Sequence, residues 1–246
     1  MKKTLFSLLL LVSVFQVMAQ ESEKTFIFLN EGRPVDTDIY KKNYPKVRNW
    51  WINETKNITY NFSAHTSESG RSYSMVFLKG DENLGAYVSK RTKLTEKIGK
   101  ELKVEMDESN ANQSQAATRS IWVQVKNMST IVPDFKMENY DFRKVSLFTV
   151  PIDKMETYEK LIEQSLAEDK ALGFVYNYII YKAIEGYPSN TYMMILPDKS
   201  IVDYYTNQGA RNAKRKGNAK STELSKKAAQ LRTGVRMDHL SRVPIQ

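Results

Sequence analysis

The chain has 246 residues, a formal net charge of +9 and no cysteine. The absence of cysteine excludes disulfide bonds, thiol nucleophiles and cysteine-ligated zinc, so stability has to come from a hydrophobic core. With 41% hydrophobic residues, the chain can bury one large core or two of ordinary size. No P-loop, dinucleotide-binding glycine motif or helical His-Glu zinc motif occurs in the sequence.

The first twenty residues have the pattern of a cleavable secretory signal peptide. Two lysines precede an apolar run from Leu5 to Val14, and Val17-Met18-Ala19 leads to a cleavage point. The apolar run of about ten residues is shorter than the roughly twenty that a membrane-spanning helix needs, which argues against an N-terminal anchor. We therefore expect residues 1–20 to be removed. The mature protein is then periplasmic or secreted and not an integral membrane protein.

The first half of the mature chain predicts, in order, a strand, a helix, a two-stranded hairpin, a second helix and a last strand. Runs of β-branched and aromatic residues mark the strands, and Gly70 marks the hairpin turn. Leu94, Ile98 and Leu102 recur every fourth residue, as on one face of a helix. The predicted elements cover residues 24–29, 38–53, 58–65 with 71–78, a helical region around 94–102, and 120–125.

The second half predicts the same order of elements. Asp153 is a candidate N-cap, and Glu156 three residues later completes a pair that resembles a capping box. Gly209, Gly217 and Asn218 make the segment before the last helix a poor helix former, and we expect that segment to be mobile. The predicted elements cover residues 144–150, 153–168, 174–184 with 190–196, a helical region around 224–231, and 235–243.

The two halves also resemble each other in sequence. Residues 58–62 are similar to 175–178, and residues 72–75 to 191–194, at an offset of about 116 to 119. Matches that keep their order through both halves favour an ancient internal duplication. The expected domains are therefore residues 21–130 and residues 131–246, with Asn61 matching Asn177 and Tyr73 matching Tyr192.

The order strand, helix, strand, strand, helix, strand is the ferredoxin-like pattern. Two such units in tandem, each with a Tyr-Asn-aromatic first hairpin strand and an aromatic-Met second one, resemble the dimeric α/β-barrel superfamily. The resemblance implies an α+β fold in which two tandem ferredoxin-like units pack sheet to sheet as one pseudo-symmetric α/β barrel. Members of that superfamily include cofactor-free monooxygenases, haem-degrading enzymes and proteins without known chemistry.

Several residues are candidates for binding a ligand. Asn is depleted in strands, and a buried amide needs polar partners that a ligand can supply, although a neighbouring turn can supply them too. Trp50 and Trp51 are neighbours on a helix and point about 100° apart, so one of them should line a pocket or an interface. His65 follows a hairpin strand, where an exposed ring is the ordinary outcome. The candidate ligand-binding residues are Asn61, His65, Trp50, Trp51, Asn177, Tyr178 and Tyr192.

The resemblance also raises the question of haem, because haem-degrading members surround the haem with a small set of Asn, Trp and His residues. The first half offers Asn30, Trp50, Trp51, Trp122 and His65, but none falls at a motif spacing that we can match. The carboxylates at Glu168-Asp169 and Asp107-Glu108 lie in charged surroundings typical of a solvated surface. We therefore assign no catalytic residue, no metal site and no cofactor.

Basic residues concentrate near the C-terminus. The segment from Arg211 to Arg236 holds nine Lys or Arg residues and one acid, a net charge of +8. In an exported protein such a segment favours an anionic envelope surface over nucleic acid, and the alternative is a solvated basic helix. The candidate residues for an anionic partner are Arg211, Lys214, Arg215 and Lys216.

The leading functional hypothesis is non-catalytic binding, in the bacterial envelope, of a small apolar or aromatic ligand between helices and sheet, or of an envelope partner. The alternative is an enzyme, either a cofactor-free monooxygenase or a haem-modifying protein, with Asn61, His65 and a tryptophan in its pocket. A third hypothesis is a purely structural or interaction protein, for which a filled interior without a pocket is expected.

Overall fold

The computed structural model describes residues 23–34, 37–102 and 118–243. The predicted signal peptide and the acidic pair at 107–108 lie outside these residues. The described elements are β1 (Thr25–Gly32), α2 (Thr37–Glu54), β2 (Tyr60–Ser67), β3 (Ser72–Lys79), α3 (Asp81–Glu101), β4 (Thr118–Gln124), η1 (Lys126–Met128), η2 (Met137–Asn139), β5 (Phe142–Thr149), η3 (Ile152–Lys154), α5 (Met155–Ala171), β6 (Ile179–Glu185), β7 (Thr191–Asp198), α6 (Ile201–Lys216), α7 (Ala219–Gln230) and β8 (Thr233–Arg242).

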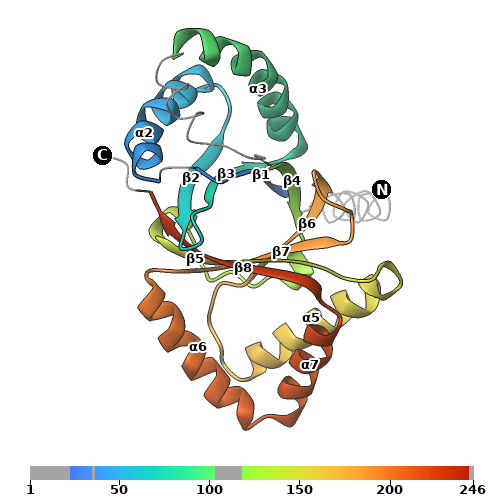
Figure 1. The fold of residues 1–246 in the computed structure, drawn as a ribbon. Coiled ribbons are helices and arrows are strands. Elements are labelled where there is room, and N and C mark those ends of the chain that lie inside the picture. The colour runs from blue at the N-terminus through green and yellow to red at the C-terminus, as the bar shows by residue number, and fades with distance from the viewer. Residues whose placement is uncertain (1–22, 35–36, 103–117, 244–246) are drawn as a thin grey trace, which may run out of the picture.

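The strands form one closed antiparallel barrel in the order β1-β3-β2-β8-β5-β7-β6-β4. The four strands of each half are neighbours, and the halves join along two edges. At one edge β2 pairs with β8, and at the other β4 pairs with β6 across an irregularity next to Trp122. Helices α2 and α3 cover the first-half strands, and α5, α6 and α7 cover the opposite side of the barrel (Figure 1). The predicted α+β class and barrel are confirmed.

Alternation along the strands divides the apolar side chains between the barrel interior and two outer layers beneath the helices. The interior cluster includes Ile27, Leu29, Tyr73, Met75, Trp122, Val145, Leu147, Ile179, Tyr181, Met193, Ile195 and Leu240. The outer layer of the first half includes Phe26, Phe28, Val76, Leu78, Tyr87 and Ile121. The outer layer of the second half includes Phe142, Phe148, Tyr158, Ile180, Tyr192, Met194, Tyr204 and Ala228.

The second hairpin differs from its prediction. Its first strand begins at Ile179 and not near residue 174, so Asn177 and Tyr178 lie just before β6. Tyr178 pairs with Thr130 in an isolated bridge, and the Asn177 amide accepts a hydrogen bond from the backbone N–H of Val132 at 2.9 Å. The segment therefore bonds to the connection between β4 and β5 and does not extend the ladder with β7.

The match of Tyr73 with Tyr192 is wrong by one residue. Tyr73 lies in the barrel interior, whereas Tyr192 lies in the outer layer beneath the helices. His65 pairs with Tyr73 in the first hairpin, and Tyr181 pairs with Met193 in the second. A slip of one position reverses which face a side chain occupies, so Met193 and not Tyr192 shares the face of Tyr73.

The segment predicted to be mobile is instead helix α6, followed by a separate helix α7. The Ser200 hydroxyl accepts a hydrogen bond from the Asp203 N–H at 3.1 Å and caps α6. The Asn218 amide accepts one from the Ser221 N–H at 2.9 Å and caps α7. Two caps outweigh the low helix propensity of the intervening glycines. The predicted Asp153 cap is also wrong, because Asp153 lies within η3 and α5 follows Lys154.

Candidate active site

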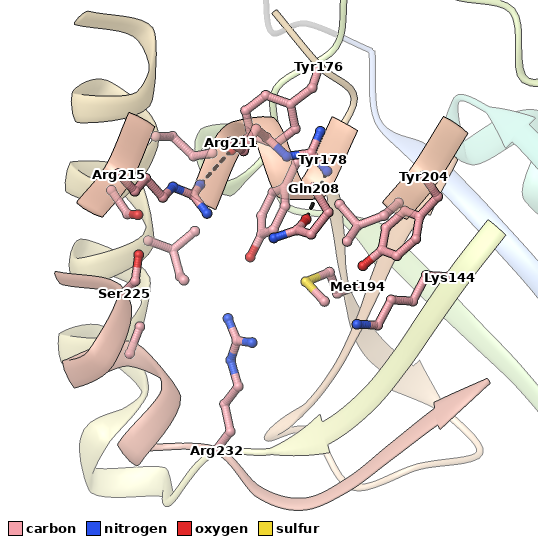
Figure 2. Close-up of a pocket in the computed structure, with 15 residues that line it drawn as sticks. Lys144, Tyr176, Tyr178, Met194, Tyr204, Gln208, Arg211, Arg215, Ser225 and Arg232 are labelled. Carbon is pink, nitrogen blue, oxygen red and sulfur yellow. Dashed lines mark hydrogen bonds between the residues drawn. The ribbon is translucent and has the colours of Figure 1, made fainter. Parts of the chain in front are cut away.

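A cavity of about 210 Å³ lies between the outer face of the second-half strands and helices α5, α6 and α7 (Figure 2). A neighbouring groove of about 430 Å³ shares Tyr176, Leu196, Tyr204 and Arg211 with it, so the two form one site. The cavity is lined by Lys144, Ile162, Ser165, Leu166, Tyr176, Tyr178, Met194, Leu196, Tyr204, Gln208, Arg211, Arg215, Ser225, Ala228 and Arg232.

Arg211 enters the cavity from α6. Only 9% of the residue is exposed, and its guanidinium lies over the ring of Tyr176 at 4.7 Å. Nη2 donates a hydrogen bond to Oε1 of Gln208 at 2.8 Å. Burial lowers the pKa of Arg211. Within the part of the chain that the structure describes, Arg211 forms no ion pair, and its direct partners are the Tyr176 ring and the Gln208 amide.

Arg232 points into the same cavity from the end of α7, opposite Arg211 (Figure 2). Its Nε donates a hydrogen bond to the Tyr158 hydroxyl at 3.1 Å, and its guanidinium lies 4.7 Å from the ring centre of Phe148. No carboxylate of the described residues pairs with it. The site thus holds two guanidinium groups at opposite ends, each against aromatic rings.

Arg215, by contrast, is neutralised by a carboxylate. Asp169 is 1% exposed and accepts hydrogen bonds from Arg215, at 2.9 Å from Nε, and from the Tyr176 hydroxyl. Burial alone would lower the pKa of Arg215, but the hydrogen bond and the charge of Asp169 raise it. Burial and the same carboxylate raise the pKa of Tyr176. The expectation that Glu168-Asp169 is a solvated surface is wrong for Asp169.

The site therefore presents positive charge, phenol groups and aromatic faces to a ligand. The cavity lining contains four cationic residues and no carboxylate, and the adjoining groove adds Lys214 and Asp198. Burial raises the pKa of Tyr178, which keeps its hydroxyl protonated at neutral pH as a donor. Guanidinium and phenol donors in a largely buried space bind planar anions and stabilise negative charge that develops on a bound oxygen atom.

The predicted ligand-binding residues of the second half do not all line the cavity. Tyr178 lines the cavity. Asn177 lines the adjoining groove, with its amide also donating to the Tyr140 hydroxyl at 3.2 Å, so nearby loop groups satisfy it. Tyr192 is fully buried in the outer layer, where its hydroxyl donates a hydrogen bond to Glu159 Oε1 at 2.7 Å. Tyr192 does not line the cavity.

The predicted ligand-binding residues of the first half have different surroundings and do not form one pocket. Trp50 donates from Nε1 to Glu101 Oε2 at 2.8 Å, and the Trp51 ring lies 6.2 Å from Tyr87, so both contact α3. Asn61 is exposed at a different pocket. His65 is fully buried, so the expected exposed ring is wrong: the strand continues to Ser67 and turns the ring toward the barrel interior.

The basic residues of α6 divide between the surface and the cavity. Lys214 and Lys216 are exposed, whereas Arg211 is buried and Arg215 is half-buried. A single exposed basic face is therefore wrong, because 3.6 residues per turn places 211 and 215 on the face toward the sheet. Sequence analysis missed Lys144, Tyr176, Tyr204, Gln208 and Arg232 as site residues. One signal in the sequence could have indicated the site: Arg211 and Arg215 are four residues apart and therefore lie on one face of a helix.

Comparison with solved structures shows the same architecture over nearly the whole chain. A "Putative monooxygenase" from Fusobacterium nucleatum superposes with a TM-score of 0.59 at 8% identity, over 91% of this chain and 94% of that one. An anthrone oxidase-like protein superposes with a TM-score of 0.56 at 10% identity, over 91% and 93%. A mutant chlorite dismutase from Candidatus Nitrospira defluvii gives 0.51 at 7% identity, over 89% and 92%.

These superpositions confirm, at the level of the fold, the predicted resemblance to the dimeric α/β-barrel superfamily. No family model and no curated protein sequence matches the chain. The hypothesis of non-catalytic binding is contradicted, because the solved structures that share the barrel are described as a "Putative monooxygenase", an anthrone oxidase-like protein and a chlorite dismutase, and these descriptions favour the enzyme alternative. Among the described residues, no group of three or more His, Asp or Glu side chains is arranged to hold a metal ion. No described helix has the length and apolar character needed to cross a bilayer.

Proposed function

We propose that the protein is a cofactor-free oxygenase acting on a small aromatic substrate that reacts as an anion. The observation that carries this proposal is a pair of guanidinium groups, the buried Arg211 and the half-buried Arg232, which lack a carboxylate partner among the described residues and face one aromatic-lined cavity. Burying a charge without a partner is costly, and an anionic ligand would remove that cost. The monooxygenase and oxidase descriptions of proteins with this fold support the proposal.

The chemistry follows from the charge of the cavity. A CH₂ group beside an aromatic ketone loses a proton more easily when guanidinium groups stabilise the resulting enolate oxygen. The carbanion then gives one electron to dioxygen, the two radicals combine to a hydroperoxide, and loss of water leaves a ketone. In total, a CH₂ group and O₂ become a C=O group and H₂O. No carboxylate or histidine lines the cavity itself, so we assign proton acceptance to Asp198, the carboxylate that lines the adjoining groove.

A haem does not fit this site. Neither histidine lines the cavity: His65 lies in the barrel interior, and the His239 ring contacts Tyr205 at 5.9 Å. We therefore route no step through a haem and favour direct reaction of the substrate anion with dioxygen.

The test is oxygen consumption with a panel of polyhydroxylated aromatic ketones that carry an acidic CH₂ group. We expect products that gain one oxygen atom and lose two hydrogen atoms, without any added cofactor. Arg211→Gln and Arg232→Gln should each lower kcat/KM about a hundredfold, as loss of one oxyanion donor does. The exposed Lys216→Gln is the matched control. Equal turnover in all three variants would remove the arginines from the mechanism, and no oxygen uptake with any panel member would overturn the proposal.

Two further parts of the proposal concern the origin and the location of the protein. The order β1-α2-β2-β3-α3-β4 and then β5-α5-β6-β7-α6/α7-β8 supports two tandem ferredoxin-like units from a duplicated ancestor, divided near residue 130. The N-terminal sequence pattern supports export with cleavage near Glu21. Intact-mass measurement of protein from cell fractions tests the second part, and chains that retain residues 1–19 in the envelope fraction would contradict it.

A further inference from the structure

A second pocket of about 460 Å³ lies at one end of the barrel, between α2, β2 and η2. Its lining has no residue in common with the cavity under α6 and α7. Arg48 comes from α2, Asn61 and Ser63 from β2, Met137 from η2, and Arg143 from β5. Its size falls within the range of pockets that hold small organic ligands.

Arg143 forms the floor of this pocket and is fully buried. Its Nη1 donates to Ser63 Oγ at 2.8 Å, and its Nη2 lies 3.5 Å from the Met137 carbonyl oxygen. Nε has no hydrogen-bond partner, and no carboxylate of the described residues pairs with the guanidinium. Burial, with Arg242 nearby, lowers the pKa of Arg143 to about 9, so the group remains charged at neutral pH.

Arg48 adds a second unbalanced charge at the wall. Its Nε is buried without an acceptor among the described residues, and its Nη1 makes a long contact of 3.4 Å with Asn49 Oδ1. Arg242 differs, because it donates to the Glu138 carbonyl oxygen at 2.6 Å and lies 3.6 Å from Asp141. The uncompensated charge of the pocket is therefore at Arg48 and Arg143.

The remaining wall is partly apolar, and its other charged residues are Lys56 and the exposed Glu138. Ile52, Ile58 and Phe62 line one part of the pocket, and Met137 lies on the other side. Guanidinium groups repel metal cations and bind carboxylates through paired N–H donors. An apolar wall next to such donors fits a ligand with a charged end and a hydrocarbon end.

We propose that this pocket binds a small monocarboxylate with an apolar group, separately from the oxygenase site. The carboxylate contacts Arg48 and the Asn61 amide, Arg143 supplies positive charge beneath them, and the apolar group lies against Ile52 and Phe62. The proposal does not depend on any oxygenase activity, because it concerns different residues.

The test uses benzoate as the probe and methyl-labelled methionine as the reporter in the full chain. Met137 lines this pocket and Met194 lines the cavity under α6 and α7, so their methyl NMR signals report the two sites separately. We expect benzoate to shift the Met137 signal saturably, and Arg48→Gln to weaken that titration at least tenfold. Arg143→Met should weaken it as well, because a methionine keeps the volume and removes the charge.

The controls decide between this pocket and the oxygenase site. Arg211→Gln should leave the Met137 titration unchanged, and Arg48→Gln should leave any Met194 titration unchanged. Benzamide, which has the same shape without the charge, should not shift Met137. If Arg143→Met does not fold, Arg48→Gln carries the test alone. A Met137 signal that ignores benzoate, or that responds equally in Arg48→Gln or to benzamide, would overturn the proposal.

Discussion

The two outer faces of the barrel have the same order of strands but are filled differently. Under α3, the Tyr87 ring contacts Phe28 and Tyr60 at 5.5 Å and Trp51 at 6.2 Å, so aromatic side chains close the space. Under α6 and α7, arginines occupy the corresponding layer and a cavity remains. Aromatic rings stabilise by burial, whereas guanidinium groups without a carboxylate cost stability unless a ligand pairs with them.

This difference suggests a division of labour between the halves. Beneath α3 the first half has a packed aromatic layer, whereas beneath α6 and α7 the second half has positive charge facing a cavity. The division of one helical region into α6 and α7 makes this arrangement possible. Helix α7 packs on α5 through Leu224 and Ala228, and α6 places Arg211 over the sheet. The comparison can be tested at matched positions of the two halves.

The largest expected effect concerns the two hairpin turns. Gly70 and Gly186 both have positive φ, 76° and 83°. A Cβ at Gly70 meets nothing within 4 Å, but one at Gly186 would lie 2.1 Å from the Arg119 carbonyl oxygen on β4. Gly186→Ala should therefore lower the free energy of unfolding by about 3 to 5 kcal/mol, and Gly70→Ala by only about 1 to 2 kcal/mol. Denaturant unfolding measures both, and equal losses would mean that the β4 contact does not matter.

Pattern and repeat were sufficient to predict the barrel, because strand alternation and helical spacing are local properties of the sequence. They were not sufficient for the site. Arg211, Arg215 and Lys216 have the same charge in sequence, and only the helix phase and the buried Asp169 decide which of them faces the cavity. His65 was misplaced because one more pair of strand residues, Thr66 and Ser67, moves the turn away from it.

The second prediction concerns the compensated charge in the cavity. Asp169→Asn should destabilise the protein by about 2 kcal/mol, less than a fully buried pair costs because 22% of the Arg215 side chain is exposed. The same change leaves Arg215 unpaired and should tighten binding of an anionic substrate analogue several-fold, as isothermal titration calorimetry can measure. Glu168→Gln is the control, because its partner Lys220 is 69% exposed and the pair should contribute less than about 1 kcal/mol.

The third prediction concerns acid sensitivity in the barrel interior. His65 pairs with Tyr73 on β3, and the matching interior position of the second half holds Tyr181. Burial, together with Arg143 and Arg242, lowers the pKa of His65 well below its usual value. Protonation then favours the unfolded chain, so stability is full above about pH 6.5 and falls as pH decreases, by up to about 2 kcal/mol at pH 5.

His65→Gln should remove most of that loss, because glutamine does not titrate. Unfolding in urea at pH 7 and at pH 5 measures the difference. His239→Gln, at a partly exposed ring, is the matched control and should keep the acid sensitivity of the parent protein. If both variants retain it, the titration responsible lies elsewhere in the barrel.

The smallest expected effect separates surface charge from cavity charge on the same helix. Lys216 is exposed at the last turn of α6, where a positive charge interacts favourably with the helix dipole. Lys216→Gln should therefore change the free energy of unfolding by no more than about 0.5 kcal/mol. It should also leave anion binding in the cavity nearly unchanged at physiological salt, where exposed charges are screened beyond about 8 Å. A loss of anion binding in Lys216→Gln comparable to that in Arg211→Gln would show that the ligand responds to the summed basic charge of α6, and the distinction between its two faces would fail.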